Sequence, residues 1–220
     1  MTGKIACLAG ASGLIGSYLL QELLNDPFFE TVRILIRKPM DIAHPKLEKK
    51  IVDFSDSDSL LVALSNSDAV FCSIGTTMKK MKGDKDTYRK IDFDIPVKLA
   101  RFCKMTGCEK FILVSSLGAN SKSYNFYQKL KGETDEAIKE SGVKTIHIMR
   151  PSILLGDRKE SRIGEDIGKA VMTALSFLIP VKYKPTHAKD VAKAMLALTK
   201  QNEEGYFIHE NKDIFKLSRW

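Results

Sequence analysis

The sequence predicts an α/β fold built on a doubly wound parallel sheet, and three observations carry this prediction. Apolar runs with strand character alternate with stretches of helical periodicity, which is typical of a parallel sheet covered by helices on both faces. The chain of 220 residues is 44% apolar, which suffices for one α/β core and leaves little room for two. The first apolar run, at residues 5–9, passes directly into a helical stretch through a glycine-rich segment.

The expected elements follow one another in regular alternation. We expect strands near residues 4–9, 31–36, 50–53, 68–73, 109–115, 144–149 and 205–208, and helices over much of 14–25, 57–65, 87–106, 124–141, 164–178 and 188–200. Right-handed crossovers place the loops that follow the strands along one edge of such a sheet, where ligands bind. The loops expected at that edge begin at Gly10, Arg37, Gly75, Ser115 and Arg150.

The glycine-rich segment reads Gly10-Ala11-Ser12-Gly13-Leu14-Ile15-Gly16. Gly10 permits a tight turn, Gly13 lets the backbone approach a pyrophosphate, and Gly16 lets the helix pack closely on the strand. The helix N-terminus then directs free N–H groups and the positive end of its dipole at the phosphates. A strand on one side and a helix on the other favour a dinucleotide cradle in a Rossmann fold. The alternative is a glycine-rich turn that binds nothing.

Two cations end the second expected strand, where a dinucleotide-binding protein contacts the adenosine ribose. An NAD site usually carries an acidic residue about 20 residues beyond the glycines, which accepts the ribose 2′-hydroxyl. Here Arg37 and Lys38 occupy that place, and a guanidinium can pair bidentately with a 2′-phosphate, so NADP(H) is favoured over NAD(H). An ordinary basic turn and an NAD site served by Asp41 stay open. Asp53, which closes the third expected strand, is a candidate acceptor for the adenine amino group.

Candidate catalytic residues follow the fifth expected strand. That strand ends in Ser115-Ser116, and Tyr127 and Lys131 stand four residues apart on the next helix, hence on one face. A tyrosine, with an ordinary pKa of about 10, needs a nearby cation to act as acid or base at neutral pH. Lys131 can supply that cation, while Ser116 binds a carbonyl oxygen that Tyr127 protonates as a hydride reaches the carbon. The alternative is a surface tyrosine beside a solvated lysine.

From the first strand to about residue 200, the chain resembles the short-chain dehydrogenase/reductase superfamily, because these motifs occur in its order. A narrower resemblance is to the Tat-interacting-protein branch of atypical members. It rests on Ser115-Ser116-Leu117-Gly118-Ala119, on Phe126-Tyr127 with Lys131-Gly132-Glu133, and on the run from Arg150-Pro151 to Arg162. The resemblance implies a compact NADP(H)-binding protein, and links some members to the regulation of transcription or transport. It implies cofactor contacts from Gly10, Ser12, Gly13, Leu14, Ile15 and Arg37, catalysis by Ser116, Tyr127 and Lys131, and Pro151 near the nicotinamide.

Further residues are expected to complete the cofactor site. The loop Ser73-Ile74-Gly75-Thr76-Thr77 keeps a small backbone that can pass the cofactor ribose. The residues added to the cofactor site are Gly16, Lys38, Asp53, Ile74, Gly75, Ser115, Tyr127 and Lys131. Many superfamily members carry an Asn in the helix before the serine strand, where it helps to relay protons. This chain offers Asp92, whose carboxylate can position water or the lysine.

The net charge of +8 raises the question of an anionic macromolecular partner. The lysines are scattered, and the one dense cluster, Lys79, Lys80, Lys82 and Lys85, lies in an expected loop without interleaved aromatic residues. No nucleic-acid-binding motif occurs elsewhere, so we interpret the cluster as a solvated loop or a lid over the site rather than as a nucleic-acid surface.

The remaining composition indicates a cytoplasmic protein. No stretch reaches the roughly 18 apolar residues of a membrane span, and the first strand begins too early for a signal peptide. The four cysteines lack metal-ligand spacing and are expected to be reduced thiols, in the core or at the surface. His44, His147 and His209 show no pairing that suggests a metal site or nucleophilic catalysis, so no metal is expected.

The substrate side is expected to be small. A cofactor part to about residue 150 and substrate-side elements over 151–220 make up one domain at 1–220. Arg158 and Arg162 could bind an anionic substrate group or form surface ion pairs, and the latter is favoured. The apolar face of residues 169–181 could cover the nicotinamide or form a subunit contact, and the oligomeric state stays open.

Three functions are compatible with these residues. The leading hypothesis is an NADP(H)-dependent oxidoreductase acting on a small carbonyl/alcohol pair through Ser116, Tyr127 and Lys131. The second is an NADPH-sensing module that presents a surface to a protein partner and has little turnover. The third is an epimerase-like enzyme that uses the cofactor transiently, although the short C-terminal part argues against a large sugar-nucleotide pocket.

Overall fold

The computed structural model describes residues 3–156 and 180–219. Its main sheet has seven strands in the order β3-β2-β1-β4-β5-β6-β9, and every neighbouring pair is parallel. The strand order reverses between β1 and β4, which opens a crevice at their carboxyl ends. This is the doubly wound α/β fold that the sequence predicts. The strands are β1 (Lys4–Ala9), β2 (Phe29–Ile36), β3 (Leu47–Ile51), β4 (Ala69–Cys72), β5 (Lys110–Val114), β6 (Thr145–Arg150) and β9 (Gly205–Glu210).

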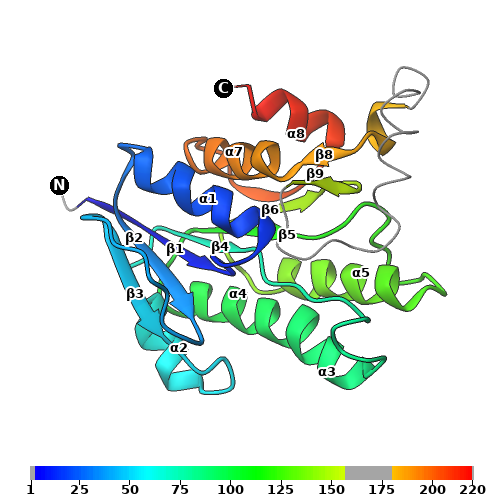
Figure 1. The fold of residues 1–220 in the computed structure, drawn as a ribbon, viewed down its shortest axis with the longest axis horizontal. Helices are drawn as coiled ribbons and strands as arrows, with labels where there is room; N and C mark the ends of the chain where they lie inside the picture. Colours follow the sequence, from blue (N-terminus) through cyan, green and yellow to red (C-terminus); the bar gives the residue numbers. More distant parts are fainter. Residues whose placement is uncertain (1–2, 157–179, 220) are drawn as a thin grey trace.

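Helices cover both faces of the sheet (Figure 1). On one face lie α1 (Leu14–Asn25), α7 (Ala188–Thr199) and α8 (Asn211–Leu217), and on the other α2 (Ser57–Leu64), α4 (Ile95–Met105) and α5 (Phe126–Lys139). Successive strand residues serve the two cores in turn, since Leu8 packs with the first group and Cys7 with the second. Strands buried on both faces explain the continuous apolar runs in the sequence.

The third strand begins and ends earlier than expected. The apolar pair Ile51-Val52 suggested a strand over 50–53, but β3 spans Leu47–Ile51 and carries the polar residues Glu48, Lys49 and Lys50. β3 is the edge of the sheet and pairs only with β2, so polar side chains are tolerated there. Asp53 therefore lies beyond the strand instead of closing it.

The helix expected over 87–106 is interrupted. It consists of α3 (Lys85–Arg89), a π-helical turn η1 (Lys90–Asp94) and α4. Pro96 has no N–H with which to bond the carbonyl of Asp92 four residues back. That carbonyl instead accepts a hydrogen bond from Thr134 Oγ1 of α5 at 3.2 Å. The irregular turn places Asp92 against α5.

Four short elements at the C-terminal end were not expected. They are β7 (Leu154–Leu155), the 3₁₀ turn η2 (Val181–Tyr183), β8 (Thr186–His187) and α8, and β7 pairs with β8. The buried Asn211 links them: its Nδ2 donates to the carbonyls of Val181, Lys182 and Lys184, and its Oδ1 accepts from Thr186 Oγ1. The expected helix 164–178, together with Arg158 and Arg162, lies outside the described residues.

The described chain bears on two further expectations. Within residues 3–156 and 180–219, no helix has the length and apolar character needed to cross a bilayer. All four cysteines, Cys7, Cys72, Cys103 and Cys108, are free thiols in the interior. Burial is the first cause that raises the pKa of Cys7 and of Cys72 to about 12, so both are held as thiols.

Two of the histidines contact each other, which the sequence did not indicate. His147 Nδ1 and His209 Nε2 lie 3.0 Å apart, and the His147 ring stacks on Phe207 at 5.3 Å. The two histidines come from β6 and β9, which are distant in sequence and adjacent in the sheet. The part of the chain that the structure describes holds no group of three or more residues suited to a metal ion. The pair is therefore a buried polar contact.

We expect His147 to make the protein less stable in mild acid. Burial, aided by the charges of His209 and Lys110, lowers the pKa of His147 to about 3. Below about pH 6.5, His147 therefore binds a proton in the unfolded chain but not in the folded chain. The free energy of unfolding falls as the pH decreases toward 3, by up to about 1.4 kcal/mol per pH unit. Urea unfolding between pH 7 and pH 5 measures this slope.

His147→Gln should flatten that slope, because glutamine does not titrate. The exposed His187 provides the control, and His187→Gln should keep the wild-type slope. An unchanged slope in His147→Gln would contradict the assignment.

Candidate functional site

The junction of β1 and α1 requires glycine at two positions, Gly10 in the loop and Gly16 in the first turn of α1. Gly10 has a φ of +94°, and a Cβ there would lie 2.8 Å from the carbonyl carbon of Ser73. A Cβ on Gly16 would lie 2.0 Å from the carbonyl oxygen of Gly10. The contacts are with backbone that has little freedom to move. Glycine therefore allows α1 to begin directly against the ends of β1 and β4.

The N-terminus of α1 is open to an anion. Gly13 is its N-cap and has no side chain, and the first turn contains no acidic residue. The first amide groups of a helix lack partners within the helix. Ile15 is buried in the core and anchors this turn, whereas Ser12 is exposed beside it. Leu14 lies against the residue that follows β7, since a Cβ on Gly156 would be 2.8 Å from Leu14 Cδ1. The cradle therefore fits a pyrophosphate by its shape and by its unpaired donors.

The end of β2 presents two exposed cations at the same edge. Arg37 and Lys38 directly follow the strand, and neither side chain forms an ion pair with the residues that the structure describes. Asp41 is also exposed there. Asp53 Oδ1 accepts hydrogen bonds from Ser55 N at 2.8 Å and from Ser55 Oγ at 2.7 Å. These bonds lower the pKa of Asp53, so its carboxylate is charged and still open to solvent.

A buried ion pair lies behind the candidate catalytic tyrosine. Lys131 Nζ is 2.8 Å from Asp92 Oδ1, and the two side chains are 8% and 1% exposed. The other carboxylate oxygen of Asp92 accepts from the backbone N–H of Thr76 at 2.8 Å. Burial by itself lowers the pKa of Lys131, but the charges of Asp92 and Tyr127 and the bond to Asp92 outweigh it, so the pKa is raised. Lys131 is therefore held as a cation.

Tyr127 lies one helical turn before Lys131 and is 39% exposed. The helix α5 begins just before it, because the Asn125 side chain accepts a hydrogen bond from Gln128 N. Tyr127 thus lies in the first turn of α5, with one side open to solvent and Lys131 close enough for their charges to interact. The structure brings together the two residues that the sequence predicts as a pair.

The loop after β5 is held between α5 and the end of β6. Ser115 is buried, and the Ser116 hydroxyl donates to the carbonyl of Leu117 at 3.3 Å. Leu117 N donates to the carbonyl of the buried Pro151 at 2.9 Å. A Cβ on Gly132 would lie 2.1 Å from Ser121 N, so the glycine next to Lys131 lets this loop pack directly on α5.

The loop after β4 completes the edge and carries the basic segment. Ile74 is half-buried, and Gly75 faces Asp92, since a Cβ on Gly75 would lie 3.5 Å from Asp92 Oδ1. The Thr76 carbonyl accepts from Tyr88 Oη at 3.4 Å, which ties the loop to α3. The turns over 78–83 follow with Lys79, Lys80 and Lys82, and Lys85 already belongs to α3, 5.3 Å from the Phe126 ring centroid. The basic segment therefore adjoins the beginning of α5.

Sequence reasoning missed a second buried ion pair beside the first. Arg150, the last residue of β6, donates through Nε and NH2 to Asp135 Oδ2 at 2.9 Å and 2.8 Å. Burial raises the pKa of Asp135 despite the nearby Ser115 hydroxyl and the Arg150 charge, which lower it. A signal existed, since Tyr127, Lys131 and Asp135 repeat every four residues on one face of α5. The Arg150 partner follows only from the sheet.

A seven-stranded parallel sheet with a glycine cradle at its switch point defines a Rossmann-fold dinucleotide-binding protein. The chain belongs to the NAD(P)H-binding family, whose sequence pattern matches residues 10–202. It is 33% identical over 178 residues to the protein HTATIP2 of Rattus norvegicus, covering 80% of this chain and 73% of that protein. It is 32% identical over 208 residues to the mitochondrial protein FMP52 of Candida albicans, covering 90% and 89%.

Solved structures with the same fold include enzymes that act on sugar nucleotides and on sugar acids. The UDP-N-acetylglucosamine 4-epimerase from Methanobrevibacter ruminantium M1 superposes with a TM-score of 0.72 at 21% identity, covering 98% of this chain and 81% of that one. The uronate dehydrogenase from Agrobacterium tumefaciens superposes with a TM-score of 0.71 at 15% identity, covering 99% and 84%. Together with the relatives in sequence, they confirm the resemblance to an atypical short-chain dehydrogenase/reductase.

We expect Lys131 and Asp92 to be strongly coupled in stability. Lys131→Met leaves the Asp92 carboxylate buried without its cation, which should cost about 3–5 kcal/mol of unfolding free energy. The double variant Lys131→Met/Asp92→Asn removes both charges, so it should be more stable than the sum of the single effects implies. Urea unfolding of the four proteins in the cycle measures the coupling.

Lys129→Met is the matched control, because Lys129 lies on the same helix and is exposed. It should change stability by less than about 0.5 kcal/mol. Additive single effects in the cycle would show that the two side chains do not depend on each other.

Proposed function

We propose that this protein is an NADP(H)-dependent oxidoreductase that interconverts a small carbonyl compound and its alcohol. The observation that carries the proposal is the buried Lys131 cation one turn from the exposed Tyr127, on the sheet edge that also holds the glycine cradle. A fixed cation beside an accessible phenol is what acid–base catalysis by tyrosine requires. The family match supports the nicotinamide dinucleotide as the ligand of the cradle.

Each residue has a distinct role in the proposed reaction. The nicotinamide, when bound, supplies or accepts a hydride. In reduction, the Ser116 hydroxyl donates a hydrogen bond to the carbonyl oxygen, and Tyr127 transfers its phenolic proton to that oxygen as the carbon gains the hydride. The resulting phenolate is stabilised by the positive charge of Lys131 and regains a proton from water, which reaches Tyr127 at its exposed side. Oxidation of the alcohol is the reverse.

Asp92 has a positioning role in this proposal. It holds Lys131 by one oxygen and the Thr76 amide by the other, so the position of the lysine is coupled to the loop after β4. Its negative charge also offsets part of the Lys131 charge as seen from Tyr127. That offset is the observation that favours a second candidate function, an NADPH-sensing module with little turnover that presents a surface to a protein partner.

The preference for NADP(H) is supported by the two exposed cations that follow β2. We expect Arg37→Asp to weaken NADPH binding by about 10- to 100-fold, because a charge-assisted bidentate contact is replaced by repulsion. NADH affinity should be retained, since a carboxylate can accept the ribose 2′-hydroxyl. Calorimetric titration with NADPH and with NADH measures both affinities.

Arg101→Asp supplies the same charge change on an exposed site of α4 and should leave both affinities unaltered. Equal NADPH affinity in Arg37→Asp and wild type would refute the assigned role of Arg37. Absence of binding of either nucleotide to the wild type would refute the oxidoreductase itself.

Tyr127→Phe separates the two candidate functions. For an oxidoreductase, loss of the phenolic proton should lower turnover of NADPH with small aldehydes and ketones by 10² to 10⁴, a typical value for a general acid. NADPH should still bind, since phenylalanine keeps the ring, and Tyr124→Phe, a fully exposed tyrosine nearby, should behave as the wild type. A sensor would keep nucleotide binding and have no turnover for Tyr127→Phe to remove.

Two further expectations remain proposals. We place the cofactor part before about residue 150 and the substrate side beyond it, in agreement with the position of Pro151 beside the Ser116 loop. We also retain a cytoplasmic location, which fractionation of cells that produce the protein would test; the word mitochondrial belongs to the name of the FMP52 relatives.

A further inference from the structure

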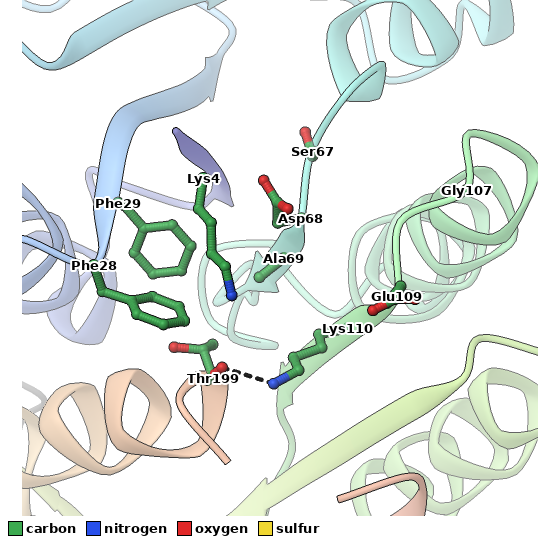
Figure 2. A pocket seen from close by; sticks show the side chains of 10 residues that line it. All are labelled: Lys4, Phe28, Phe29, Ser67, Asp68, Ala69, Gly107, Glu109, Lys110 and Thr199. Carbon is green, nitrogen blue, oxygen red and sulfur yellow. Dashed lines mark hydrogen bonds between the residues drawn. The ribbon is translucent and has the colours of Figure 1, made fainter. Parts of the chain in front are cut away.

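A pocket lies at the amino ends of the strands, opposite the end that carries the glycine cradle. It has a volume of about 260 Å³, and it is built at the amino ends of β1, β4 and β5, where Figure 2 shows Lys4, Ala69 and Lys110 around one hollow. The glycine cradle follows the carboxyl end of β1. Since β1 is six residues long, the two sites are roughly 20 Å apart. The pocket is therefore separate from the proposed active site.

Two ammonium groups point into this pocket from different strands. Figure 2 shows the nitrogen atoms of Lys4 and Lys110 directed toward the same hollow. Lys110 Nζ donates hydrogen bonds to the carbonyl of Thr199 at 2.7 Å and to the carbonyl of Gln201 at 2.5 Å. An ammonium group has three N–H donors, so these two carbonyls leave one donor for another acceptor. Lys4 Nζ lies 4.2 Å from the ring centroid of Phe28. Neither ammonium group pairs with a carboxylate of the described residues.

The two charges affect each other. Burial, and next the charge of Lys4, lower the pKa of Lys110, against a smaller opposite effect of Glu109. Two like charges that share a partly enclosed space, with no ion pair to a described carboxylate, favour an anion between them.

The acidic residues at the rim are already engaged. Asp68 Oδ2 accepts a hydrogen bond from Ile5 N at 2.7 Å, which ties the beginning of β1 to β4. Glu109 Oε1 lies 3.5 Å from Lys144 Nζ, on the side away from Lys4. Among the described residues, neither carboxylate forms an ion pair with Lys4 or Lys110, but both line the pocket and limit how negative a ligand it accepts.

An apolar wall lies beside Lys4 and forms part of the lining. Phe28 and Phe29 line the pocket, with ring centroids 5.0 Å apart in an edge-to-face arrangement. Phe28 is only half-buried, so part of its ring faces the hollow. The wall provides a surface for a ring or a short apolar chain, while the lysines provide the contact for a charged group.

We propose that this pocket binds a small organic anion, whose phosphate or carboxylate group lies between Lys4 and Lys110 and whose apolar body packs on Phe28. The volume fits a single ring with one charged substituent. The site would act independently of the nucleotide, because it uses none of the residues of the cradle.

The test uses phenyl phosphate, inorganic phosphate and phenol as probes of the full chain. Phenyl phosphate should bind more tightly than either inorganic phosphate or phenol, because only it supplies both the charge and the ring. Amide signals of Ala69, Gly107 and Lys110 should shift in NMR spectra during the titration. Signals of the cradle should saturate separately if phosphate also binds there.

Lys4→Met is the discriminating variant. It removes the charge and keeps an apolar stem over Phe28, and Lys4 makes no side-chain hydrogen bond with the described residues, so folding should be preserved. We expect about tenfold weaker binding of phenyl phosphate, as for the loss of one charged hydrogen-bond donor. Lys129→Met, at an exposed lysine of α5, is the matched control and should bind as the wild type.

The outcomes separate this proposal from the proposed function. Arg37→Asp should leave phenyl phosphate binding at the pocket unchanged while it weakens NADPH binding. Equal affinities in wild type and Lys4→Met, or shifts confined to the cradle, would overturn the pocket proposal and leave the oxidoreductase unaffected. Loss of NADPH binding with retained phenyl phosphate binding would overturn the oxidoreductase proposal and leave the pocket proposal unaffected.

Discussion

The candidate active site depends on one buried ion pair, between Lys131 of α5 and Asp92 of the π-helical turn. Removing two charges from water is costly, and the cost is met here by a 2.8 Å contact together with the Thr76 amide on the other carboxylate oxygen. The pair fixes three segments relative to one another: α5 with Tyr127, the turn before α4, and the loop after β4. A site assembled from separate loops keeps its geometry only if such contacts hold them together.

The pair also bears on the chemistry. A lysine next to a tyrosine stabilises the phenolate through its positive charge. Asp92 offsets part of the Lys131 charge, and it also holds Lys131 in position. This is why the oxidoreductase and the sensor are both built from the same residues here, and why turnover, rather than nucleotide binding, distinguishes them.

The two ends of the strands present different chemical groups. At the carboxyl ends, the reversal of strand order and the start of α1 provide backbone donors for a phosphate group, and glycine is needed because the backbones approach within contact distance. At the amino ends, side-chain ammonium groups converge on a smaller pocket with an aromatic wall. The first site is a property of the fold, whereas the second depends on the particular residues Lys4, Phe28 and Lys110.

The sequence by itself determined the alternation of strands and helices, the glycine cradle, and the Tyr127/Lys131 pair, because each depends on residues within a few positions of one another. It did not determine that β3 begins at Leu47, because an edge strand carries polar residues that hide its pattern. For Asp92 the sequence left water and the lysine open as partners, and the structure shows the contact with Lys131. The pairs Asp135–Arg150 and His147–His209 were decided only by the tertiary structure. The partners in all three pairs lie on different elements, and only the packing of α5 on the π-helical turn and the order of strands in the sheet bring them within reach.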